Sequence, residues 1–167
     1  MSKIKVLEIV TRLNIGGPAV NVIYIAADCD KNKFDIKILT GKESADEGNM
    51  FYLCAEKQTP YIYIPELQRE INLKNDFIAF IKIIYHILKF NPDIVHTHTA
   101  KAGTLGRLAA IITFRKKIIH TFHGHIFDGY FSPLKSKIFL TIELLLAKFT
   151  DYIISVSNAQ REVFVGL

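Results

Sequence analysis

Residues 93–127 read DIVHTHTAKAGTLGRLAAIITFRKKIIHTFHGHIF and hold five of the six histidines of the chain. Two apolar runs in this stretch become polar at their carboxyl ends, at His98–Thr99 and at His123–Gly124. The residues between the two runs, 101–114, have the length and apolar spacing of a helix. A strand, a helix and a second strand form a parallel pair in an α/β sheet, and ligands of such sheets gather at the carboxyl ends of the strands.

The same alternation of elements extends over the rest of the chain. Short β-branched runs predict strands at Lys5–Thr11, Phe34–Thr40, Tyr61–Ile64, Ile94–Thr99, Lys117–His123 and Tyr152–Val156. Longer apolar stretches predict helices at Pro18–Asp28, Asn49–Lys57, Asn75–Phe90, Lys101–Phe114 and Pro133–Phe149, and a further helix after Ser157. This order predicts one α/β domain over residues 1–167: a Rossmann-like, doubly wound, mainly parallel sheet with helices on both faces.

The composition is that of a folded domain, because half of the residues are apolar and 22% are charged. Cys29 and Cys54 lie in different segments without the spacing of a zinc site, which favours free thiols in a reducing cytoplasm. Residues 1–11 lack the cleavage site of a signal peptide. The net charge of +5 favours anionic partners such as phosphates or acidic lipid head groups, although a lysine-rich composition alone also explains it.

Several common functions leave no signature in this sequence. The G-x-G-x-x-G fingerprint is absent, and the second strand ends in Thr40–Gly41 where a dinucleotide site needs an acidic residue. Neither the G-x-S-x-G elbow of hydrolases nor a G-K-[ST] phosphate loop is present. Arg115–Lys117 is a short basic cluster without interleaved aromatics, so no nucleic-acid partner is expected.

Gly16 and Gly17 lie between the first predicted strand and the first predicted helix. Backbone N–H groups at such a helix start can approach a phosphate closely, because the helix dipole and the unsatisfied donors favour an anion. A tight turn that needs positive φ is the alternative explanation of the pair.

The histidines divide between the two faces of the predicted sheet. His96 and His98 share one face of their strand, and His96 is expected to be buried with a hydrogen-bond partner while His98 lies at the ligand edge. Strand alternation sends His120 and His123 to opposite faces, and Asp128 is the only nearby carboxylate. A catalytic zinc ion needs three converging ligands, so neither a metal nor another cofactor is expected.

The helix that follows His98 opens with residues suited to a ligand. Thr99 closes the strand, Lys101 can meet a phosphate as a point charge, and Arg107 can grip it with two hydrogen bonds. Gly103 would let the backbone approach a ligand, or it would serve close packing of the helix on the sheet.

Two helices are more apolar than a surface helix requires. The helix Phe77–Phe90 and the helix Pro133–Phe149 carry lysines at their margins, a pattern that favours an interface with anionic lipids. Packing of both helices over the sheet, with the lysines reaching solvent, explains the same pattern.

Four motifs together resemble a known family. They are IGGPAVNV at 15–22, HTHTAKAGTLGRLAA at 96–110, HTFHGHIF at 120–127 and DYIISVSNAQRE at 151–162. This combination resembles the amino-terminal domain of the retaining glycosyltransferases of family 4, which have the GT-B fold, and the resemblance covers nearly the whole chain.

The resemblance implies transfer of a sugar from a nucleotide sugar to a hydroxyl of a glycan or lipid-linked saccharide, with retention. It places Gly16–Gly17 at the donor diphosphate and His123 beside the transferred sugar, as the catalytic residue. The acceptor would then face the remaining candidates, which are His98, Thr99, Lys101, Gly103 and Arg107.

In that family a second domain binds the nucleotide sugar through a pair of glutamates, and we expect this domain to be absent from the present chain. The chain alone is then expected to be inactive and to bind nucleotide sugars no better than about millimolar. It is expected to be cytoplasmic, and a peripheral position on the inner face of the membrane stays open. Two alternatives stay open: one half of a sugar-nucleotide 2-epimerase, which would turn over without an acceptor, and a noncatalytic subunit that docks a separate donor domain onto a membrane.

Overall fold

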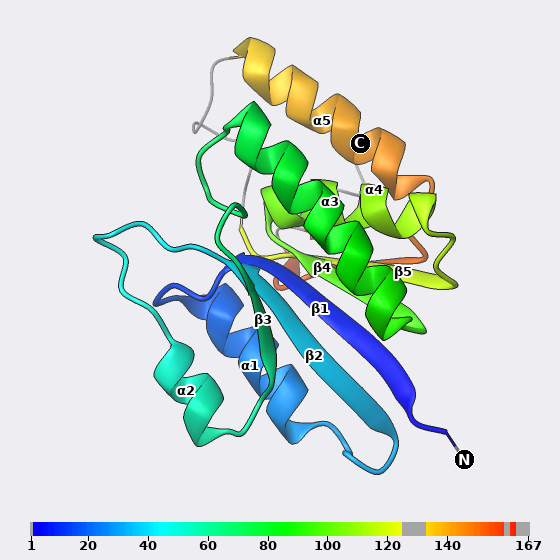
Figure 1. The fold of residues 1–167 in the computed structure, drawn as a ribbon. Coiled ribbons are helices and arrows are strands. Elements are labelled where there is room, and N and C mark those ends of the chain that lie inside the picture. Colours follow the sequence, from blue (N-terminus) through cyan, green and yellow to red (C-terminus); the bar gives the residue numbers. More distant parts are fainter. Residues whose placement is uncertain (1, 125–132, 159–160, 163–167) are drawn as a thin grey trace.

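A computed structural model describes residues 2–124, 133–158 and 161–162. Within them, a six-stranded sheet has the order β3-β2-β1-β4-β5-β6, and every neighbouring pair is parallel (Figure 1). The strands are β1 (Ile4–Arg12), β2 (Phe34–Gly41), β3 (Tyr61–Ile64), β4 (Ile94–His98), β5 (Lys117–Phe122) and β6 (Tyr152–Ser155). The helices are α1 (Gly17–Asp28), α2 (Phe51–Glu56), α3 (Leu73–Phe90), α4 (Ala100–Ile112) and α5 (Pro133–Ala147). The predicted Rossmann-like α/β fold is therefore confirmed.

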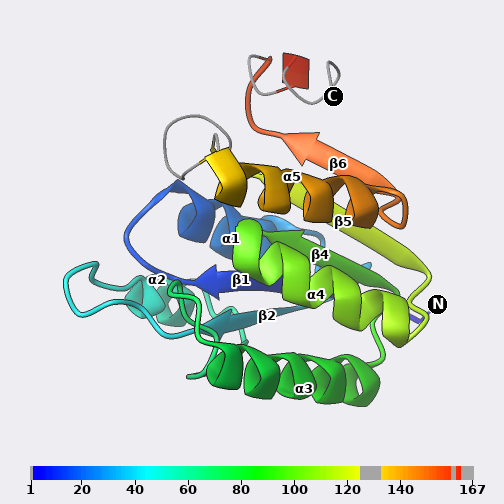
Figure 2. The ribbon, with the colours of Figure 1, turned by 90° about the horizontal axis from the view of Figure 1, so that it is seen from above.

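Helices cover both faces of the sheet. Figures 1 and 2 show α1 and α2 on one face and α3, α4 and α5 on the other. Alternate residues of β1 serve the two layers: Val6 and Val10 pack with α1 and α2, whereas Leu7 and Ile9 pack with α3 and α4. Burial on both faces explains why this strand reads as an apolar run instead of alternating with polar residues.

The predicted boundaries differ from the observed ones by a few residues, and three of these differences are described here. β4 ends at His98, so Thr99 is the N-cap of α4, with φ of 63°. β5 ends at Phe122, which leaves His123 just beyond the strand. α3 begins at Leu73 because the side chain of Asn72 accepts a hydrogen bond from the Asn75 N–H and caps the first turn.

Two predicted segments fall outside the described residues. They are the loop after Gly124, at residues 125–132, and most of the helix after Ser157, at residues 159–160 and 163–167. In the part of the chain that the structure describes, no helix is both long enough and apolar enough to cross a membrane.

Candidate active site

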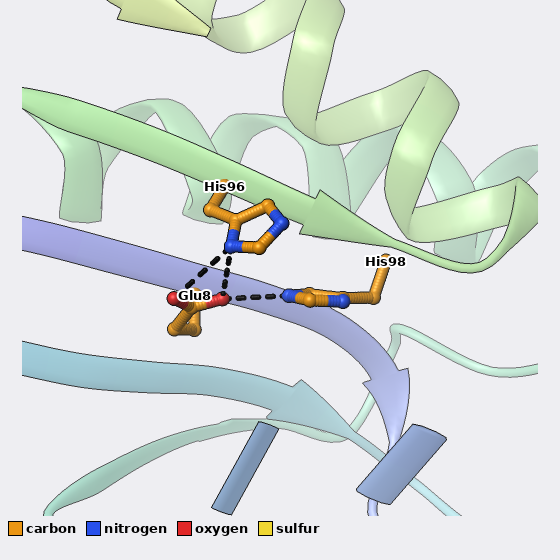
Figure 3. A group of neighbouring side chains, drawn as sticks. All are labelled: Glu8, His96 and His98. Carbon is orange, nitrogen blue, oxygen red and sulfur yellow. Dashed lines mark hydrogen bonds and ion pairs between the residues drawn. The ribbon is translucent and has the colours of Figure 1, made fainter. Parts of the chain in front are cut away.

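Glu8, in the middle of β1, meets His96 and His98 of β4 on the face of the sheet that carries α1, and His98 is the last residue of its strand. Figure 3 shows the carboxylate between the two imidazoles. Its Oε2 lies 2.6 Å from Nε2 of His98 and 3.0 Å from Nδ1 of His96, and its Oε1 lies 3.2 Å from the same Nδ1. All three side chains are buried, and His98 is fully inaccessible to solvent.

The carboxylate in this cluster corrects one prediction. Asp128 was expected to be the only acid near the histidines, but the acid that contacts them is Glu8, and Asp128 lies outside the described residues. The available signal was the single acid, Glu8, inside the apolar run KVLEIVT, since an acid in a strand buried on both faces needs a partner. The predictions that His96 and His98 share a face, and that His96 is buried with a partner, are confirmed.

The cluster extends across the sheet to β5. Nδ1 of His98 lies 2.9 Å from Nε2 of His123, and Nε2 of His96 lies 2.8 Å from Oγ1 of Thr121. His123 is partly exposed, whereas the residues behind it are buried. A continuous line of hydrogen bonds therefore runs from buried Glu8 through His98 to the accessible imidazole of His123.

Burial and mutual contacts shift the acidities in this line. Burial by itself would raise the pKa of Glu8, but the attraction and hydrogen bonds from His96 and His98 outweigh it and lower the pKa to about 2. Burial lowers the pKa of His98, against the opposing effect of Glu8. Burial, with the neighbouring histidines, lowers the pKa of His123 to about 4. At neutral pH the carboxylate is ionised, and His98 and His123 are neutral imidazoles.

Glu8, His96 and His98 have the residue types of a metal site, and their ligand atoms lie within 4.8 Å of one another. Two ligands of a tetrahedral zinc ion lie about 3.3 Å apart, because each is about 2.0–2.1 Å from the metal. The Glu8–His98 distance of 2.6 Å is instead that of a direct hydrogen bond. The arrangement therefore fits hydrogen bonding better than ligation of an ion.

The opposite face of the sheet holds His120, as strand alternation predicted. Nδ1 of His120 lies 2.8 Å from Oγ1 of Thr97, and Nε2 is buried without a partner among the described residues. Burial, followed by the charge of Arg107, lowers the pKa of His120 to about 2. A Cβ added to Gly103 would lie 2.5 Å from Cε1 of His120, so this glycine permits close packing of α4 on β5.

Arg107 lies in the interior instead of at the ligand edge. Its side chain is fully buried, its Nε donates to the Gly103 carbonyl at 2.9 Å, and its Nη2 lies 2.6 Å from Oε2 of Glu143 on α5. The predicted pair of hydrogen bonds from Arg107 to a ligand phosphate does not fit this placement, because the guanidinium joins α4 to α5 in the interior. Likewise His98 is buried, so it reaches a ligand only through His123.

Thr99 and Lys101 lie at the entrance of α4 with partners of their own. Oγ1 of Thr99 lies 2.7 Å from Oγ1 of Thr11, which joins the carboxyl ends of β4 and β1. Nζ of Lys101 lies 2.7 Å from Oδ1 of Asp76 on α3 and donates to the carbonyl oxygen of Glu70. Lys101 is thus tethered toward α3, while Thr99 stays between the two strand ends.

Gly16 and Gly17 begin α1, immediately after β1. Gly16 is the N-cap with an extended backbone, at φ 168°, so the tight turn with positive φ is not what this residue provides. A Cβ added to Gly17 would meet no atom of the described residues within 4 Å. Among these residues, nothing covers the start of α1, which lies at the same sheet edge as His123.

A cavity of about 480 Å³ lies elsewhere, beside the amino-terminal part of the sheet. Lys5, Lys37, Tyr61, His86 and Phe90 contribute to its lining. It does not include any of the predicted site residues, so the site is better defined by the strand ends than by this cavity.

Comparisons with known proteins agree with the fold and with the motifs. The chain is 32% identical over 103 residues to the UDP-Gal:alpha-D-GlcNAc-diphosphoundecaprenol alpha-1,3-galactosyltransferase of Escherichia coli, a match that covers 62% of the chain and 27% of that protein. Among solved structures, Anabaena HepE in complex with UDP and glucose superposes with a TM-score of 0.73 at 17% identity, covering 98% of this chain and 41% of that one.

Epimerases share the fold as well. UDP-N-acetylglucosamine 2-epimerase from Rickettsia bellii has a TM-score of 0.65 at 14% identity, and the match covers 99% of this chain and 42% of the epimerase. The chain thus spans less than half the length of each of these three proteins. The family model for Glycosyltransferase Family 4 matches residues 15–167, which is nearly all of the sequence. By this match the chain belongs to glycosyltransferase family 4.

Proposed function

We propose that this chain forms the acceptor-side domain of a retaining glycosyltransferase that moves a sugar from a nucleotide sugar to a hydroxyl of a lipid-linked saccharide. The observation that carries the proposal is His123, an accessible neutral imidazole held by a buried line of hydrogen bonds, in a chain of family 4. An imidazole so placed can hydrogen-bond a sugar hydroxyl where charge develops in the transition state.

The name of the relative from Escherichia coli states the donor and the acceptor of its own reaction, and this supports a donor class and an acceptor class for the present chain. Its name gives UDP-galactose as donor and a GlcNAc-diphosphoundecaprenol as acceptor, with an α-1,3 linkage in the product. Galactose is α-linked in UDP-galactose too, so that reaction proceeds with retention. We extend the class of donor and acceptor to this chain, and not the identity of the sugar.

Each end of the donor would meet a different strand end. The diphosphate would lie at the start of α1, where Gly17 leaves open space and the helix dipole favours an anion. The transferred sugar would contact His123, and the acceptor would approach Thr99 and Lys101. Three of the predicted acceptor residues would act from inside the domain, through packing and hydrogen bonds that hold this edge of the sheet in place: His98, Gly103 and Arg107. No step in this scheme needs a metal ion or another cofactor.

A second domain would bind the base and ribose of the donor. The described strand ends offer hydrogen-bond donors and an imidazole, and the family pattern assigns the nucleotide to another Rossmann-like unit. The catalytic cleft would then form between the two domains, with this chain as the acceptor-side wall.

The test is transfer of radiolabelled sugar from UDP-galactose, UDP-glucose and UDP-GlcNAc to GlcNAc-diphosphoundecaprenol. It uses the product of the complete reading frame that contains this chain, and NMR of the product gives its anomeric configuration. We expect an α-linked product with one of these donors and loss of turnover in His123→Ala. Unchanged kcat in His123→Ala would remove the catalytic role of this residue.

Two controls separate the alternatives. Incubation with UDP-GlcNAc and no acceptor detects 2-epimerase activity, since epimerisation at C2 needs no acceptor. A protein that turns over neither with nor without acceptor, but that binds vesicles, would instead be a noncatalytic docking subunit.

We also propose that α3 contacts an anionic membrane surface, which would bring the domain to a lipid-linked acceptor. Leu73, Phe77, Ile81, Tyr85 and Leu88 recur every three or four residues on α3, and each is exposed by 48% or more. Lys74 and Lys89 lie at the two ends of this stripe. An apolar stripe with flanking lysines suits the interface of a bilayer with acidic lipids.

A further inference from the structure

The hydrogen-bond line behind His123 has only one arrangement of protons that satisfies every member at neutral pH. The carboxylate of Glu8 is ionised and can only accept hydrogen bonds. Both imidazoles that contact it must therefore donate, His96 through Nδ1 and His98 through Nε2. The branch through His96 ends at Thr121, whose hydroxyl can donate to Nε2 of this histidine.

The second branch continues from His98 to the accessible histidine. Because a neutral His98 carries its proton on Nε2, its Nδ1 has a lone pair and accepts. The group 2.9 Å from this Nδ1 is Nε2 of His123, which must then carry the proton. His123 is left with an unprotonated Nδ1, and this atom has no hydrogen-bond partner among the described residues.

We infer that Glu8 and His98 are positioning residues that hold His123 in the Nε2–H tautomer, so that its Nδ1 offers a lone pair to a hydroxyl of the substrate. The buried charge of Glu8 sets the direction of the whole line, because reversing it would require a donor where the carboxylate has none. The accessible ring nitrogen of His123 is thus a hydrogen-bond acceptor and not a donor. That the hydroxyl belongs to a sugar rests on the proposed function, whereas the tautomer does not.

A variant at Glu8 could reverse the direction of the hydrogen bonds along this line. Glu8→Gln replaces one acceptor oxygen with an amide that can donate to Nε2 of His98. His98 would then carry its proton on Nδ1 and donate to His123, and His123 would shift to the Nδ1–H tautomer. The same shift turns the accessible atom of His123 from an acceptor into a donor.

The measurement is long-range ¹H–¹⁵N correlation NMR of the ¹⁵N-histidine-labelled chain at neutral pH, which separates protonated from unprotonated ring nitrogens. The His123 signals are identified by their loss in His123→Gln. We expect the Nε2–H tautomer in the unmodified chain and a shift toward Nδ1–H in Glu8→Gln. Thr121→Val, which removes the partner of His96 outside the line to His123, should leave the His123 tautomer unchanged.

The outcomes separate the two proposals. An Nδ1–H tautomer of His123 in the unmodified chain overturns the inference without any variant, even if Glu8→Gln does not fold. A folded Glu8→Gln chain with His123 unchanged overturns the role of Glu8. Absence of glycosyl transfer together with the expected spectra would remove the proposed function and leave the positioning line in place.

Discussion

The guanidinium of Arg107 on α4 and the carboxylate of Glu143 on α5 form an ion pair of 2.6 Å, and the arginine side chain is fully buried. Nη1 of the same guanidinium has no partner among the described residues. The pair joins the two helices that lie over β4 and β5 (Figure 2). It supports the packing of α4 and α5 on the face of the sheet opposite Glu8, His96 and His98.

Removing one partner of this pair should destabilise the domain strongly. Glu143→Ala leaves a buried, unpaired guanidinium, and we expect a loss of about 3–5 kcal/mol in the free energy of unfolding, measured by urea denaturation. The double variant Arg107→Met, Glu143→Leu should recover most of that loss. Lys33→Ala breaks the exposed pair with Asp30 and should cost less than about 0.5 kcal/mol. A loss below about 1 kcal/mol in Glu143→Ala would contradict the structural role.

Gly103 and Gly17 should respond differently to the same added methyl group. In Gly103→Ala the new Cβ would lie 2.5 Å from the buried ring of His120, so we expect a loss of about 1–3 kcal/mol in stability. Gly17→Ala meets open space and should fold with unchanged stability. A Gly103→Ala variant that keeps its stability but loses acceptor binding would show that this glycine faces a ligand after all.

Most of the fold could be predicted because each helix and strand has a characteristic pattern in its own stretch of sequence. Strands buried on both faces appear as short β-branched runs, and Pro, Gly and Asn mark the ends of the helices. Arg107 was misplaced because its charge was given more weight than its position. Gly103, Gly106, Arg107 and Ala110 are all buried on one face of α4, at a spacing that predicts packing for the arginine as well.

The site could be predicted only in part, because its key contact joins distant segments. Glu8 lies 88 residues from His96 and 90 from His98, so no spacing in the sequence connects them. The order of the strands brings them together, since β1 lies between β2 and β4 in the sheet. His98 and His123 could be placed at one edge of the sheet because each lies at or near the end of a predicted strand. Their direct contact could not be predicted, because His123 lies just beyond the end of β5, where strand geometry no longer fixes the direction of a side chain.

The chain alone should bind the donor weakly. Titration calorimetry with UDP-galactose and UDP-GlcNAc should give a dissociation constant no better than about 1 mM, which corresponds to about −4 kcal/mol. The physical reason is that the diphosphate and the sugar would find partners here while the base and ribose would not. Micromolar binding by this chain would overturn the proposal that a second domain holds the nucleotide.

The apolar stripe of α3 should govern binding to vesicles. The chain is expected to cosediment with vesicles that contain phosphatidylglycerol and to be released by high salt, because the attraction of its lysines is screened. Phe77→Gln with Ile81→Gln should abolish cosedimentation. Tyr52→Gln, an exposed residue of α2 outside the stripe, should not. Equal binding by the double variant and the unmodified chain would exclude α3 as the membrane contact.

Acid should destabilise the domain, beginning near pH 6.5. The pKa of His120 falls from 6.5 in the unfolded chain to about 2 in the folded one, so between these values the unfolded state binds a proton that the folded state does not. The stability tied to His120 is therefore complete above pH 6.5 and is lost as the pH falls, at about 1.4 kcal/mol per pH unit.

His123 and Glu8 act in the same direction as His120, over narrower pH ranges. The lowered pKa of His123 adds to the loss between pH 6.5 and about 4, and the lowered pKa of Glu8 adds to it between pH 4.5 and about 2. Urea midpoints measured from pH 7.5 to 4.5 should therefore decline below pH 6.5. His120→Asn, which can keep a hydrogen bond to Thr97, should make the decline shallower by the contribution of one proton. A urea midpoint that stays constant from pH 7 to pH 5 would contradict a neutral, buried His120.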